Sequence, residues 1–185
     1  MKRTTIILLL IAAILAVAVL ATGCGDQSEQ ADRLIDEVNG IATTIEPKVK
    51  QADSLMTQAT EQLSQGKLTD EKTTLTKAQS LVDEIIADLK TAKSKTDEAA
   101  ALKISDDSRK YLEANGRALQ ANINMWGAVR DMATTMLADP AWELPETRTK
   151  MAELEKVRAE QAAIWQEAWD EAQGLGTKLA GENNK

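Results

Sequence analysis

Apolar residues recur every three or four positions from about residue 34 to residue 179, and this spacing limits what the chain can fold into. A period near 3.6 residues places apolar side chains along one face of an α-helix, whereas a half-buried β-strand has a period of two. No stretch after the N-terminal apolar run shows the alternation of a strand. The sequence therefore predicts an all-α protein.

Breaks in the pattern divide it into helices. The first helix is predicted to begin at a capping box of Asp26 and Glu29 and to end near Gln65, with Gly66 as its C-cap residue. The second begins at Thr69 and carries the most regular seam in the chain. That seam is a heptad pattern of Leu75, Ala78, Val82, Ile85, Leu89, Ala92, Thr96 and Ala99.

Two further helices follow. Ser105 is the predicted N-cap of the third helix, because the seam changes phase at that point and two acidic residues follow. This helix should stop at Asp139-Pro140, and Pro145 should occupy the first turn of the fourth. Gly174 and Gly176 are expected to fray the end of the fourth helix.

Similar helix lengths and short connections predict an antiparallel up-down four-helix bundle with long helices. We expect residues 29–180 to form this single domain and residues 181–185 to form a polar tail. Pro47 lies inside the first helix and removes a backbone hydrogen bond, so we expect it to kink or split that helix.

The N-terminus has a different character. A short basic start, Met1-Lys2-Arg3, precedes an apolar run from Ile6 to Ala21. This run of about 16 residues suits the core of a signal peptide and is shorter than the ~20 residues needed to span a bilayer. It leads into Leu20-Ala21-Thr22-Gly23-Cys24, which contains the only cysteine.

This stretch resembles the lipobox of bacterial lipoproteins, although Ala21 stands where Leu is most common. The resemblance covers residues 1–24 and implies that residues 1–23 are removed as a signal peptide once the Cys24 thiol has received a diacylglycerol. The mature protein would then be held to the cell membrane, on its extracytoplasmic side, by a palmitate-type anchor and the short tether 24–28. The alternatives are an uncleaved membrane helix and an ordinary signal peptide.

The charge of the chain, and the residue types that it lacks, exclude several classes of function. The chain has 22 basic and 29 acidic residues, and removal of Lys2 and Arg3 leaves a net charge of about −9. An acidic surface argues against nucleic acid as a partner. The chain has no histidine, which excludes Ser-His-Asp catalysis and the usual zinc, haem and di-iron sites. We therefore predict no catalytic residues, no metal and no cofactor.

Polar residues interrupt the apolar stripes of the third and fourth helices. Asn115 and Asn122 lie on the seam of the third helix, and Arg158 and Gln161 lie on that of the fourth. Counting along antiparallel helices from the predicted turns places Asn122 level with about residue 160. The same count brings Asp83 or Glu84 of the second helix, and the Pro47 region of the first, to this level.

Two interpretations of these polar residues remain open. In one, Asn122, Arg158 and Gln161 form a small-ligand pocket walled by Trp126 and Trp165. In the other, they form a buried polar layer that fixes helix register, or Arg158 simply extends to solvent along its aliphatic stem.

The tryptophans bear on the question of a partner surface, because the chain has four of them and no phenylalanine. Trp142 lies in the connection between the third and fourth helices, where a partner could contact it. We expect a membrane-anchored lipoprotein with a non-enzymatic helical-bundle interaction domain and a protein partner of unknown identity. The alternatives are a small-ligand-binding lipoprotein and an oligomeric coiled-coil spacer.

Overall fold

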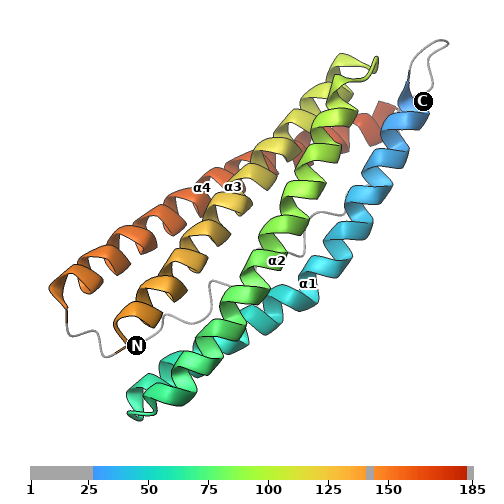
Figure 1. The fold of residues 1–185 in the computed structure, drawn as a ribbon. Helices are drawn as coiled ribbons and strands as arrows, with labels where there is room; N and C mark the ends of the chain where they lie inside the picture. The colour runs from blue at the N-terminus through green and yellow to red at the C-terminus, as the bar shows by residue number, and fades with distance from the viewer. Residues whose placement is uncertain (1–26, 141–143, 183–185) are drawn as a thin grey trace.

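Four α-helices make up the fold (Figure 1). The structure, a computed structural model, describes residues 27–140 and 144–182, and 93% of it is helical with no strand in those ranges. The helices are α1 (Ser28–Ser64), α2 (Leu68–Ala101), α3 (Asp106–Ala138) and α4 (Pro145–Glu182). The prediction of an all-α four-helix bundle is confirmed.

The helices form a long rod in which each one reverses the direction of the one before (Figure 1). Neighbours in sequence pack against each other, so α2 lies between α1 and α3, and α3 lies between α2 and α4. The helices α1 and α4 make little direct backbone contact. We call the gap between these two outer helices the α1–α4 seam.

Several helix ends follow the signals in the sequence. Ser105 caps α3, and its Oγ accepts a hydrogen bond from the backbone N of Ser108 at 3.1 Å. The same helix ends at Ala138, directly before Asp139-Pro140, and α4 begins at Pro145. These predicted boundaries are therefore confirmed.

A Schellman motif ends α1. Gly66 has a positive φ of 71°, the left-handed conformation that glycine adopts without a steric penalty. The backbone N of Lys67 donates to the carbonyl of Gln62, and that of Gly66 donates to Leu63, both at 2.9 Å. Gly66 thus ends the helix as predicted, one residue beyond the C-cap Gln65.

The predicted capping box at the start of α1 is wrong. The N-cap is Gln27, which makes no side-chain capping bond, and Asp26 lies outside the described residues. Gln27 instead bonds to the loop between α2 and α3. Its backbone N donates to the carbonyl of Lys103 at 2.8 Å, and its Oε1 accepts from the backbone N of Lys103 at 3.0 Å. This long-range pairing replaces the local cap.

The sequence predicted local weakness in two helices, and neither helix is broken there. Pro47 does not split α1, because Pro47 and the acceptor that it leaves unpaired, Thr43, are both on the exposed face, where water can satisfy the carbonyl. Gly174 and Gly176 do not end α4, which continues to Glu182. The last turns are held by Leu179, which is buried, so tertiary packing outweighs the low helix propensity of glycine.

The core runs along the rod as several groups of buried residues. The middle group draws on α1, α2 and α3, and from α4 only the half-buried Ala162 packs against it. Near the start of α1 all four helices meet, and there Ala31 and Leu34 share a group with Ala172 and Leu179. Side chains of α1 and α4 therefore meet at that end of the α1–α4 seam, whereas α4 contributes only Ala162 to the middle group.

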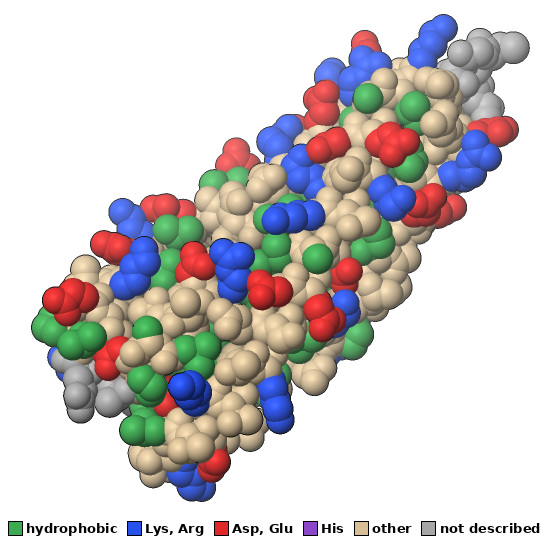
Figure 2. Space-filling model, in the orientation of Figure 1, with side chains coloured by type: hydrophobic (Ala, Val, Ile, Leu, Met, Phe, Trp, Pro, Cys, Tyr) green, Lys and Arg blue, Asp and Glu red, His purple; other side chains and the backbone are tan. Residues whose placement is uncertain are grey.

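Ion pairs lie on the outside of the rod. Lys48 Nζ of α1 contacts Asp88 Oδ2 at 2.7 Å and Glu84 Oε2 at 3.3 Å on α2. Glu84 is thus engaged at the surface and Asp83 is exposed, so neither joins Asn122 as expected. The count from the turns gives only the height along the rod, and at that height Val82 and Ile85 take the inward face of α2 while Asp83 and Glu84 face outward. On the face shown in Figure 2, acidic and basic side chains are interspersed, and hydrophobic ones form small separate groups.

Candidate functional site

Two cavities lie in the α1–α4 seam, above the floor that α3 provides. The Asn122 cavity is lined by residues of all four helices, among them Val38, Thr96, Asn122 and Trp165. The Asp53 cavity lies toward the α1–α2 turn and is lined by residues of α1, α3 and α4. Asn122 and Trp126, which line one cavity each, are one helical turn or about 6 Å apart along α3.

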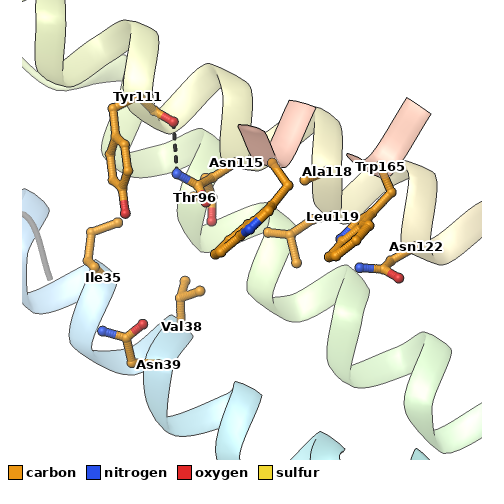
Figure 3. Close-up of a pocket in the computed structure, with 11 residues that line it drawn as sticks. Ile35, Val38, Asn39, Thr96, Tyr111, Asn115, Ala118, Leu119, Asn122 and Trp165 are labelled. Carbon is orange, nitrogen blue, oxygen red and sulfur yellow. Dashed lines mark hydrogen bonds between the residues drawn. The ribbon is translucent and has the colours of Figure 1, made fainter. Parts of the chain in front are cut away.

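Asn122 is the polar centre of the first cavity (Figure 3). It is 4% exposed, and its Oδ1 has no hydrogen-bond partner among the described residues. Figure 3 shows the Trp165 indole beside it. Trp165 stacks on Trp169 of the same helix, with ring centroids 6.1 Å apart and an interplanar angle of 4°. A buried amide oxygen without a partner destabilises the folded state by about 1–3 kcal/mol. A small hydrogen-bond donor beside this oxygen would therefore be stabilising.

The volume of this cavity limits how large that hydrogen-bond donor can be. Its volume is about 20 Å³, and one water needs roughly 10–15 Å³ of such volume. A single water therefore fills the space beside Asn122, and an organic ligand does not fit without movement of the helices. The volume favours the structural interpretation of Asn122 over the ligand pocket.

The structure separates the five residues that the sequence grouped as a possible ligand site. Asn122 and Trp165 line the first cavity, and Trp126 and Arg158 line the second. Gln161 lines neither of these two, because its Oε1 accepts a hydrogen bond from Asn124 Nδ2 at 3.0 Å. Asn115, also on the predicted seam, donates from Nδ2 to the carbonyl of Tyr111 at 2.8 Å, which is the dashed line in Figure 3.

The Asp53 cavity has a volume of about 70 Å³ and an unusual wall. Its apolar lining residues are Val49, Met56, Met125, Trp126 and Val129. Two charged residues complete the wall, Asp53 from α1 and Arg158 from α4. A negative and a positive side chain, one from each of the two helices beside the seam, therefore border an otherwise apolar cavity.

Asp53 was not among the residues singled out from the sequence. It makes no hydrogen bond or ion pair with the described residues, and burial raises the pKa of its carboxyl from 3.8 to about 6, against the opposing effect of the Arg158 charge. The sequence feature that could have identified Asp53 is its spacing from the apolar residues of α1. Asp53 is four residues after Val49 and three before Met56, so it lies on the apolar face of α1.

Arg158 is close enough to influence Asp53 but is bonded elsewhere. Its Nε and Nη2 donate to Glu155 Oε2 at 3.1 and 2.9 Å. Its side chain is 24% exposed and that of Glu155 is 55% exposed, so the pair lies at the mouth of the cavity. The three groups together carry a charge of −1 when both carboxyls are ionised.

The raised pKa of Asp53 predicts how stability depends on pH. The folded state holds the proton more tightly than the unfolded chain, so the free energy of unfolding should increase as pH falls from about 7 to about 4. Arg158 of α4 is the charge that acts on Asp53, and Lys50 of α1 is paired with Glu46. In urea unfolding across this range, Asp53→Asn should show less of the increase than the natural chain. An identical pH dependence in the two proteins would contradict the assignment.

Other predicted features remain outside what the structure describes. Cys24 and Trp142 lie in the segments 1–26 and 141–143. Within the described ranges, no group of three acidic, histidine or cysteine side chains is arranged to hold a metal ion. No helix in those ranges is both long and apolar enough to cross a membrane.

Comparison of the chain with protein-family models, with curated proteins and with solved structures found no match.

Proposed function

We propose that this chain is a lipid-anchored protein of the bacterial cell envelope whose helical bundle binds a partner without catalysing a reaction. The observation that carries the binding role is the α1–α4 seam. Helices that are neighbours in the chain pack against each other, whereas α1 and α4 make few backbone contacts and two cavities lie between them. Cavities between the helices of a bundle are a usual place for a binding site.

The proposed anchor rests on residues 1–24 and agrees with the course of α1. This helix begins at Ser28, four residues after Cys24, and Gln27 is bonded to Lys103 of the α2–α3 loop. A lipid on Cys24 would hold that end of the rod at the membrane. The α1–α2 and α3–α4 connections would then lie about 50–57 Å away, at 1.5 Å per helical residue.

The anchor is tested by the mass of the mature N-terminus. The full chain, produced in a bacterium that processes lipoproteins, should lose residues 1–23 and carry a diacylglycerol on Cys24. The matched variant Cys24→Ser should keep its signal segment and gain no lipid, because the acceptor thiol is absent. Cleavage at another position, or a processed chain with a free Cys24 thiol, would rule out the lipid anchor.

The binding role is tested by photo-cross-linking in the same cells. A photoreactive amino acid at Asn39, which lines the seam, should give discrete cross-linked products. The same amino acid at Ser94, which is exposed on α2, should give none. Equal products from both positions would show that the seam is no preferred contact surface.

Small-ligand binding is a second candidate function. The specific observation in its favour is the Asp53 cavity, which is more than three times as large as the Asn122 cavity. The Asp53 carboxylate in its wall makes no hydrogen bond or ion pair with the part of the chain that the structure describes. In this alternative the lipid-anchored bundle holds a small molecule in the seam rather than a protein.

A further inference from the structure

The chemistry of the Asp53 cavity selects among three classes of ligand. A neutral apolar molecule would fill the space but would leave the Asp53 carboxylate further desolvated and still without a partner, which is unfavourable. An anion would face the Asp53 carboxylate, and the Arg158 guanidinium on the opposite side is already hydrogen-bonded to Glu155. A cation would give Asp53 a direct ion pair, which it does not form with any described residue, although the Arg158 charge acts on it.

The apolar wall specifies an organic cation rather than a metal ion. One carboxylate among Met56, Met125 and Trp126 offers too few oxygens to replace the hydration shell of a hard metal ion. An indole ring attracts an ammonium group through its electron-rich face, and methionine side chains adapt to alkyl groups. The cavity therefore combines the three features that recognise an alkylammonium group.

We propose that the Asp53 cavity binds a small alkylammonium group, with Asp53 as its counter-ion and Trp126 and the two methionines around its carbon atoms. This proposal deepens the second candidate function by naming the ligand class. It does not depend on the lipid anchor.

The volume sets the size of the group. At roughly 10–15 Å³ for each water-sized unit, about 70 Å³ holds about five non-hydrogen atoms. A longer ligand would extend along the seam, where α1 and α4 make few backbone contacts. Arg158 lines the same cavity and competes with an external cation for Asp53. Its guanidinium is hydrogen-bonded to Glu155 and forms no ion pair with Asp53, which leaves the carboxylate to an external cation.

The test is calorimetric titration of the full-length chain, in a non-ionic detergent at pH 7.5, with butylammonium chloride. We expect saturable binding with a Kd on the order of millimolar, as suits a ligand of about five non-hydrogen atoms. Butanol and butyrate, which share the alkyl chain, should bind at least tenfold more weakly. Equal affinity for the three compounds would overturn the proposal.

Substitutions locate the site. Asp53→Asn should weaken butylammonium binding at least tenfold, whereas Asp83→Asn, which removes an equal charge from an exposed position, should change it less than twofold. Glu155→Gln should also weaken binding, because it releases Arg158 to pair with Asp53. Equal losses from Asp53→Asn and Asp83→Asn would mean that the overall negative charge attracts the cation, and the site would be rejected.

A pH titration of the natural chain gives a second readout that needs no variant. Butylammonium binding should weaken as pH falls through about 6, because protonation removes the charge of Asp53. Binding that is unchanged between pH 7.5 and pH 4.5 would overturn the proposal. The N-terminal mass of the same preparation reports on the lipid anchor separately, so failure of the cation site and failure of the anchor are told apart.

Discussion

Replacing Ile85 with alanine is expected to lower the free energy of unfolding by about 3 kcal/mol. Ile85 is fully buried in the middle of α2 and belongs to the core group that joins α1, α2 and α3. The substitution removes buried methyl and methylene groups and leaves a cavity, and such changes cost about 2–5 kcal/mol. Urea unfolding followed by circular dichroism at 222 nm measures the loss.

The matched control is the same substitution at Ile164, which is 46% exposed on α4. Ile164→Ala should change the free energy of unfolding by less than about 0.5 kcal/mol, as is usual for surface positions. The comparison isolates burial, because residue type and helical setting are shared. Equal losses at the two positions would show that α4 is covered on a face that the bundle leaves exposed.

Replacing Glu71 with methionine is expected to increase the free energy of unfolding at pH 7 by about 1–3 kcal/mol. Glu71 is fully buried near the start of α2, and neither of its carboxylate oxygens has a hydrogen-bond partner among the described residues. A buried charge without a partner is costly, and an apolar side chain of similar length removes that cost. Methionine also adapts to the shape of the existing space.

The pH dependence of this effect follows from the direction of the pKa shift. Burial raises the pKa of the Glu71 carboxyl above its usual value of about 4.5, so the folded state favours the protonated form. The natural chain should therefore gain stability as pH falls, and the advantage of Glu71→Met should shrink toward pH 4. Glu98→Gln, at an exposed position of α2, should show neither effect. An advantage that persists at pH 4 would point to packing rather than charge.

The helices could be predicted from the sequence because their signals are local. The spacing of apolar residues defines a helical face, and Ser105, Gly66 and Pro145 act on the backbone within a few residues of themselves. The helices continue through Pro47 and through the glycines of α4 for a common reason. There the local preference competes with a packed or solvated environment that the pattern does not contain.

The candidate site could be predicted only in part because it depends on register between helices. Asn122, Trp126, Trp165 and Arg158 each line one of the two cavities. They divide between the cavities because Asn122 and Trp126 are one turn apart along α3, and Arg158 and Trp165 are about two turns apart along α4. Asp53 was missed for a related reason. One carboxylate on an apolar helix face becomes notable only when the packing of the other helices buries it, and that packing is not contained in the local pattern.

We propose that the four helices complete a core within one chain and that a partner binds at the α1–α4 seam. Native mass spectrometry of the processed chain, released from a non-ionic detergent, tests this proposal. We expect the mass of a single chain. A dimer or higher oligomer as the dominant species would contradict it, because a second copy would then cover the seam and the protein would be an oligomeric spacer.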